Sequence, residues 1–282
     1  MNPRRRRIRT GFGAALPAAL SSSIALPAWA QGSTDAKLQA AIDGPQRSAA
    51  NRARDGARHP YDTLKFFGIA PDQKVIEISP GGGWYTEILA PYLRENGRFY
   101  AATERADDPD AYRSKSRRNF DEKLARNPEV YDRVSVGTFP RGLAFEDIAP
   151  PGGADLVLTF RNLHNWIEDG HLDESLRAFA AVLKTGGVLG VEEHRAPPGT
   201  SIEVIKKTGY VTEALAIERA QAAGFELAAR SEVNANPRDT KDHPNGVWSL
   251  PPTLRGGEVD RARFLAIGES DRFTHRYVKV RG

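Results

Sequence analysis

The stretch Lys74–Thr86, KVIEISPGGGWYT, constrains the fold of this chain more than any other. Its first half, Lys74–Ser79, is rich in β-branched apolar residues, which predicts a strand covered on both faces. Three glycines then permit a sharp turn, and a helix is expected from about Trp84, with free N–H groups at its start. A strand, a glycine turn and a helix are typical of a nucleotide-type cofactor site in a parallel sheet. The alternative is a glycine-rich turn that binds no ligand.

Six further segments have the composition of strands, and helical patterns separate most of them. These segments are Arg98–Thr103, 130–139, Ala154–Phe160, Val188–Glu192, Phe225–Val233 and Arg272–Val280. Such alternation predicts an α/β fold, a mostly parallel seven-stranded sheet with helices on both faces. No helical pattern lies immediately before the last segment, so that strand is free to run antiparallel.

The helical patterns divide the chain into a cover and a main domain. Residues 31–70 are expected to form a helical cover, interrupted at Gly44-Pro45, and residues 71–282 the main domain. The predicted helices are 31–58 in one or two pieces, Tyr61–Phe67, Trp84–Glu95, Asp107–Arg126, Leu172–Leu183 and Gly209–Ala223. An excursion at about 234–258 is rich in proline and is expected to act as a rigid lid.

Residues 1–30 have the pattern of a cleavable signal peptide. Five arginines in the first nine residues precede the uncharged run Thr10–Ala30, which ends in the small-x-small sequence Ala28-Trp29-Ala30. Pro17 and Pro27 make this run a poor membrane-spanning helix, so no stable span is expected after cleavage. The expected location is therefore periplasmic or secreted. Export before folding and export of the folded protein both stay open.

The net positive charge of the chain comes from that segment. The whole sequence has 40 Lys+Arg and 36 Asp+Glu, and residues 1–30 hold five Arg and no acid. Removing them leaves 35 basic and 36 acidic residues, a net charge of −1. The composition therefore gives no reason to expect nucleic-acid binding. The absence of cysteine excludes a disulfide or a thiol site.

The motif Glu77-Ile-Ser-Pro-Gly-Gly-Gly resembles the first motif of class I S-adenosylmethionine (SAM) dependent methyltransferases, acid-x-Gly-x-Gly-x-Gly. Here Ser79 replaces the first glycine, and Pro80 follows it. The resemblance covers roughly Asp72 to Val280. The segments FRNLHNW at 160–166 and DTKDHPNGVW at 239–248 are more specifically similar to a family of exported predicted methyltransferases. These likenesses imply a Rossmann-like sheet whose last strand is antiparallel, and SAM as the cofactor.

The resemblance implies that cofactor-binding residues lie at the ends of the first, second and fourth strands. They are Glu77, Pro80, Gly81, Gly82, Gly83, Glu104, Thr159, Phe160 and Arg161. Glu77 would orient the turn and the cofactor's amino group. Glu104 would accept hydrogen bonds from the ribose hydroxyls, because a carboxylate offers two acceptors and no donor. Phe139 and Pro140 would flank the adenine. For Glu104 the alternative is an exposed surface carboxylate.

Rare residue types gather where the carboxyl ends of the strands are expected, and ligands bind at that edge in parallel sheets. The substrate-binding candidates are Trp84, His59, Trp166, His243 and Trp248. We expect a small, partly aromatic or apolar substrate stacked between Trp166 and Trp248. The alternative is that the tryptophans cap the core and the histidines are merely polar.

The catalytic candidates are Asn162, His164, Glu193 and His194. Methyl transfer is an in-line displacement that depends mainly on holding donor and acceptor in line. A base such as His164, Glu193 or His194 is needed only when the acceptor must lose a proton, and Asn162 would fix the acceptor. The alternative for Glu193-His194 is a polar strand end paired with itself. Asp239, Asp242 and His243 are potential metal ligands, but their spacing does not support a site, so no metal is predicted.

Together these features predict a SAM-dependent methyltransferase acting on an unidentified small molecule in the cell envelope. The alternative is an exported, non-catalytic ligand-binding or scaffold protein that retains the fold. It is motivated by Ser79 and by the cofactor itself, which is charged and made in the cytoplasm. An NAD enzyme is disfavoured by Glu77 and Thr86. The sequence does not indicate an oligomeric state.

Overall fold

One seven-stranded sheet organises the chain, with strand order β3-β2-β1-β4-β5-β7-β6. The computed structural model describes Met1 and residues 35–139 and 148–280, so the predicted signal peptide and Pro140 lie outside the described residues. The strands are β1 (Lys74–Ile78), β2 (Arg98–Thr103), β3 (Ser135–Thr138), β4 (Ala154–Phe160), β5 (Leu183–His194), β6 (Phe225–Ser231) and β7 (Arg272–Lys279).

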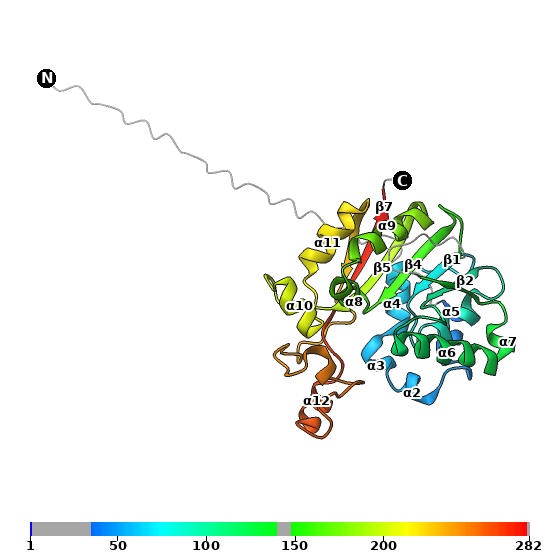
Figure 1. Ribbon diagram of the computed structural model, residues 1–282. Helices are drawn as coiled ribbons and strands as arrows, with labels where there is room; N and C mark the ends of the chain where they lie inside the picture. The colour runs from blue at the N-terminus through cyan, green and yellow to red at the C-terminus, as the bar shows by residue number, and fades with distance from the viewer. Residues whose placement is uncertain (2–34, 140–147, 281–282) are drawn as a thin grey trace. The chain divides into compact units, whose positions relative to one another are not determined.

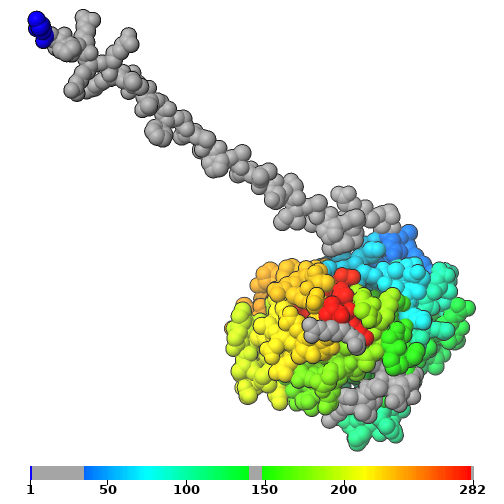
Figure 2. Space-filling view, turned by 90° about the horizontal axis from the view of Figure 1, so that it is seen from above, coloured from blue at the N-terminus to red at the C-terminus, as the bar shows by residue number. Residues whose placement is uncertain are grey.

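The first five strands pair in parallel, and β7 lies antiparallel between β5 and β6. The prediction of an antiparallel last strand is therefore confirmed. Because β7 runs against its neighbours, it begins at the edge where β1, β4 and β5 end. Figure 2 shows its far end, in red, reaching the surface beside the yellow segment that includes α11 (Glu213–Ala222).

Apolar residues on both faces of the strands produce two cores. On β1, Ile76 faces a core that contains Phe179, whereas Val75 faces a second core that contains Leu89. This alternation follows from the period of two in a strand. It explains why the central strands read as continuous apolar runs.

Helices cover both faces of the sheet (Figure 1). The face with Val75 packs against α1 (Ala36–Asp43), α4 (Pro60–Phe67), α5 (Thr86–Leu93), α6 (Ala111–Arg126) and α7 (Pro128–Tyr131). The other face packs against α8 (Leu163–Asp169), α9 (Leu172–Val182), α10 (Ile202–Thr208) and α11. Among the described residues no helix is both long and apolar enough to span a bilayer.

Several helix ends follow local sequence signals. Pro60 occupies the first turn of α4, and Gly68 ends that helix with a φ of 81°. The carboxylate of Asp110 accepts hydrogen bonds from the amides of Tyr112 and Arg113 and so caps α6.

The structure adds elements that the sequence pattern did not predict. The N-terminal cover contains α2 (Ala49–Arg52) and α3 (Asp55–Arg58) after the expected break at Gly44-Pro45. The helices α8 and α10 were not predicted either, since each has only seven residues and follows a strand end closely. The connection between β6 and β7 holds the 3₁₀ helix η2 (Gly246–Ser249) and α12 (Arg261–Ile267). Figure 1 shows α2, α3 and α12 at the same end of the sheet.

Candidate cofactor and acceptor site

The glycine turn leaves open space where a ligand would approach. Ser79 and Gly81 adopt positive φ angles of 47° and 55°, and the Ser79 amide donates to the Ala102 carbonyl at 2.7 Å. A Cβ added to Gly81 or Gly82 would have nothing within 4 Å. At Gly83, by contrast, a Cβ would lie 3.2 Å from Phe120, so this glycine allows packing against α6 and does not face the ligand space.

A cavity of about 270 Å³ lies over this turn. Predicted cofactor residues from β1, the turn and the end of β4 line it, namely Glu77, Pro80, Gly81, Gly82, Phe160 and Arg161. Trp84 and Asn162 also line it. Sequence reasoning missed Asn51, Arg54 and Arg58, which come from the N-terminal cover. The predicted roles of these residues in binding stay predictions, but the fold does place them around one space.

Glu77 is a buried carboxyl at the base of the cavity. Its side chain accepts a hydrogen bond of 2.7 Å from the hydroxyl of Thr86, which lies in the first turn of α5. Burial raises the pKa of Glu77 to about 7, although the Thr86 hydroxyl, Lys123 and Arg161 act in the opposite direction. The carboxyl can therefore change charge near neutral pH, and a cation in the cavity would favour its ionised form.

Trp84 fastens the N-terminal cover over the cavity. Its indole N–H donates to the Asn51 carbonyl at 3.0 Å, and the guanidiniums of Arg47 and Arg58 lie 4.8 Å and 4.7 Å from its ring. With 6% of its surface exposed, Trp84 is largely occupied by these contacts. Its predicted contact with substrate is thus limited to the edge that lines the cavity.

Tyr85 and Phe160 form one wall of the cavity. Their rings stack with centroids 3.6 Å apart, and the Tyr85 hydroxyl donates to Glu192 at 3.3 Å. Burial and the neighbouring Glu192 carboxylate raise the pKa of Tyr85 well above its usual value, so its hydroxyl stays protonated.

Three other candidates for the cofactor, Glu104, Thr159 and Phe139, are absent from the cavity lining. Glu104 is partly exposed at the end of β2, and its carboxylate accepts a hydrogen bond from the Thr103 hydroxyl at 2.8 Å. Thr159 is buried, and its hydroxyl oxygen accepts from the Asn162 amide at 3.1 Å, so it positions Asn162. The Phe139 ring packs against Trp166 and Phe179 in the core and is not a free platform for adenine.

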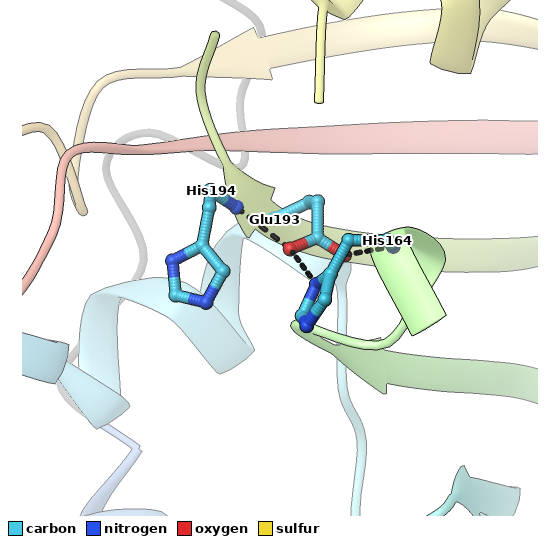
Figure 3. A group of neighbouring side chains, drawn as sticks. All are labelled: His164, Glu193 and His194. Carbon is cyan, nitrogen blue, oxygen red and sulfur yellow. Dashed lines mark hydrogen bonds and ion pairs between the residues drawn. The ribbon is translucent and has the colours of Figure 1, made fainter. Parts of the chain in front are cut away.

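The structure brings together three of the four catalytic candidates, His164, Glu193 and His194 (Figure 3). The Glu193 carboxylate contacts Nδ1 of His164 at 3.0 Å and accepts from the amides of Leu163 at 2.6 Å and His194 at 2.8 Å. The contact with the Glu193 carboxylate favours the His164 tautomer with a proton on Nδ1, which leaves Nε2 as an acceptor. The fourth candidate, Asn162, donates to the Ile78 carbonyl at 3.1 Å.

His194 is held as a neutral imidazole. Its Nδ1 lies 2.5 Å from the Ser270 hydroxyl. Burial, together with His164, Arg161, Arg272 and Arg58, lowers the pKa of His194 well below its usual value. The ring centroids of His164 and His194 are 5.3 Å apart.

The three side chains also lie close enough together to bind a metal ion, and the sequence did not predict a metal site there. One ligand atom from each of His164, Glu193 and His194 lies within 4.8 Å of the others. However, Glu193 is already saturated by N–H donors from the backbone and from His164. We interpret the carboxylate as orienting His164.

The predicted stacking of a substrate between Trp166 and Trp248 is wrong. The Trp166 ring points into the core, with centroids 5.7 Å from Phe139 and 5.4 Å from Phe179. Trp248 lies elsewhere, 6.0 Å from the His164 ring and beneath the guanidinium of Arg255. Only Trp248 is therefore placed beside the catalytic candidates.

The predicted substrate contact of His243 is also wrong, because its side chain is wholly covered. Its Nε2 lies 2.8 Å from Asp239, and its ring packs on Phe264. The Asp239 carboxylate also accepts from the Tyr210 hydroxyl and the Asp271 amide. The contact between His243 and Asp239 therefore joins two residues within the connection between β6 and β7.

His59, the remaining substrate candidate, joins α3 to α4 at a φ of 40° and is absent from the cavity lining. Nδ1 of its ring is buried and has no hydrogen-bond partner among the described residues.

Comparison with known proteins supports the fold. No family model matches the chain, and no curated protein matches it in sequence. Among solved structures, a SAM-dependent methyltransferase from Aquifex aeolicus matches with a TM-score of 0.51 at 18% identity, over 71% of this chain and 92% of that one. The cyclase SpnF matches with a TM-score of 0.59 at 17% identity, over 88% and 94%. YcgJ from Bacillus subtilis matches with a TM-score of 0.51 at 13% identity, over 80% and 99%.

At these identities the likeness establishes the fold alone, a class I methyltransferase fold. One of these neighbours is a cyclase, so the fold does not by itself decide the reaction. The reaction depends instead on the residues that line the cavity and on the cluster of His164, Glu193 and His194.

Proposed function

We propose that this protein is a SAM-dependent methyltransferase that acts on a small molecule in the cell envelope. The observation that carries the proposal is the cavity over Gly81 and Gly82, where the backbone is uncovered between the ends of β1 and β4. Open glycines at that edge of a sheet suit a ligand that approaches the main chain closely. The fold shared with a SAM-dependent methyltransferase agrees with it.

The residues present fit this cofactor. Glu77 would attract its ammonium group, Gly81 and Gly82 would admit its methionine and ribose parts, and Glu104 would accept from the ribose hydroxyls. When bound, SAM supplies an electrophilic methyl group. The contribution of the chain is then to hold an acceptor in line and to exclude water.

His164 is suited to remove a proton from an acceptor. Glu193 holds the proton on Nδ1, so the free Nε2 is the basic atom. The Glu193–His164 pair is immobilised by three backbone amides that donate to the carboxylate. His194 and Trp248 flank the His164 ring and would restrict the size of the acceptor.

The export part of the proposal depends on residues 1–30, whose pattern is that of a signal peptide. Mass spectrometry of the protein recovered from the cell envelope would test it. A chain that begins at Gln31 supports export, and an intact N-terminus in the cytoplasm contradicts it.

Calorimetric titration with SAM and with its demethylated product, S-adenosylhomocysteine (SAH), tests the cofactor assignment. We expect both to bind. Gly82→Ala should weaken binding about tenfold, because overpacking costs about 1–3 kcal/mol and the added methyl group enters the cavity.

Gly56→Ala is the matched control for that variant. It adds the same atom at an exposed position of α3, where nothing lies within 4 Å. If the folded protein binds neither ligand, the methyltransferase proposal fails. The alternative, a non-catalytic binding protein on this fold, would then be preferred.

A further inference from the structure

The cavity has a cationic wall that the cofactor does not neutralise. Arg54, Arg58 and Arg161 line the cavity. We name these three residues the arginine wall. Two of them come from α3 and the residue before it, and the third follows β4.

The acids that pair with the arginine wall lie behind it and outside the cavity lining. Glu269 contacts Nε of Arg54 at 2.7 Å and Nε of Arg58 at 3.3 Å. Glu192 contacts Arg161 at 3.4 Å and also pairs with Arg272 at 2.8 Å. The two carboxylates of Glu192 and Glu269 are thus shared by four guanidiniums, those of the arginine wall and of Arg272.

Two guanidinium nitrogens of the wall are buried and have no hydrogen-bond partner among the residues that the structure describes. They are one terminal nitrogen of Arg54 and one of Arg58. The Arg58 side chain is only 3% exposed, so solvent does not satisfy it. An unsatisfied buried charged donor is costly, and an incoming oxyanion would supply the missing acceptor.

The ion pairs show the same excess of positive charge. Burial and the neighbouring Arg161 lower the pKa of Arg58 to about 9, despite the opposing effect of Glu269. For Glu269 burial would raise the pKa, but Arg58, Arg272 and Arg54 lower it to about 2. An additional anion would stabilise the charged form of Arg58.

SAM is poorly suited to neutralise the positive charge of the arginine wall, because its sulfonium and ammonium groups carry two positive charges and its carboxylate only one negative charge. Glu77, the acid that does line the cavity, is available to these cationic groups. Arg161 lies three residues before His164, so the wall also continues toward the candidate base. Its φ of 61° is unusual for a non-glycine residue, and such strain concentrates at functional sites.

We propose that the arginine wall is an oxyanion site for the methyl acceptor, which therefore carries a carboxylate or phosphate group. This inference rests on the proposed function and specifies its substrate class. It replaces the expectation of a small, partly aromatic or apolar substrate stacked between Trp166 and Trp248.

Inorganic phosphate titrated into the full-length chain, with and without saturating SAH, tests the proposal. Phosphate should bind in both cases, because the proposal assigns the arginine wall to the acceptor and not to the cofactor's carboxylate. Arg58→Gln and Arg161→Gln should each weaken phosphate binding about tenfold, as expected for loss of one charge-assisted hydrogen bond. The control is Arg219→Gln, which removes a guanidinium that pairs with Asp173 on the surface, and it should bind as the wild type does.

Each contrary result has a distinct meaning. Displacement of phosphate by SAH would assign the arginines to the cofactor's carboxylate and overturn the proposal, as would phosphate binding that neither variant weakens. Absence of phosphate binding would also overturn it. Absence of SAH binding would instead contradict the proposed function, and phosphate held by the same arginines would still support the oxyanion site. If Arg58→Gln does not fold, Arg161→Gln decides, because its side chain is 21% exposed and makes one long contact with Glu192.

Discussion

Replacing Glu77 by glutamine should change how the stability of the protein depends on pH. The folded protein holds the pKa of Glu77 at about 7, against an ordinary 4.5, because the carboxyl is buried. Between these values the folded state keeps a proton that the unfolded chain releases. Stability therefore falls as pH rises through this window, by about 3 kcal/mol in total at about 1.36 kcal/mol per unit.

The amide of Glu77→Gln resembles the protonated carboxyl and can still accept from the Thr86 hydroxyl. Relative to wild type, the free energy of unfolding of the variant should therefore increase by about 3 kcal/mol between pH 4.5 and pH 7. Urea unfolding at a series of pH values, followed by tryptophan fluorescence, measures this difference. His194 acts in the opposite direction, because its lowered pKa costs stability as pH falls, but it is present in both proteins.

Glu122→Gln is the control, since it removes an exposed carboxylate that pairs with Arg126 at the surface. A difference between wild type and Glu77→Gln that does not vary with pH would refute the reasoning. Glu77 would then be solvated or paired in a way that the buried Thr86 contact does not represent.

Two further predictions concern the ligands. Glu104→Ala should weaken SAH binding by about 1–3 kcal/mol in calorimetry, the range for hydrogen bonds to a charged partner, and unchanged affinity would remove Glu104 from the ribose site. Once an acceptor is found, His164→Gln should lower turnover much more than SAH affinity, since Nε2 is the basic atom of the Glu193–His164 pair. Full activity of this variant would exclude His164 as the base.

The sheet could be predicted from the sequence because its signals are local. Apolar runs that include β-branched residues indicated β1 and β4, and the lack of a helical crossover before β7 indicated its direction. The cavity-lining residues near the glycine turn could be predicted for the same reason, since they lie next to one another in the chain.

The orientation of side chains around α8 could not be predicted, because the helix itself was not recognised. His164 and Trp166 are two residues apart, which separates them by about 200° around a helix axis. One therefore faces Glu193 and the other faces the core. Read as a loop, the same segment allowed both to face the substrate.

The arginine wall was missed for a different reason. Arg54 and Arg58 belong to the sequence AANRARDGAR at 49–58, which has the composition of a solvated, charged helix. Their burial depends on Trp84 and Glu269, which are distant in sequence. Only the tertiary fold brings these partners together.

The antiparallel direction of β7 has a consequence for how this protein could diversify. The strand β6 ends, and β7 begins, at the same edge of the sheet, so the whole connection 232–271 starts and finishes at the edge where β1 and β4 also end. Within the connection Asp239 contacts His243 and accepts from the Asp271 amide, and it also accepts from Tyr210, which lies outside the connection between α10 and α11. Exchange of this one segment would therefore replace Trp248 beside His164, and Glu269 beside the arginine wall, while the sheet and the glycine turn stay unchanged.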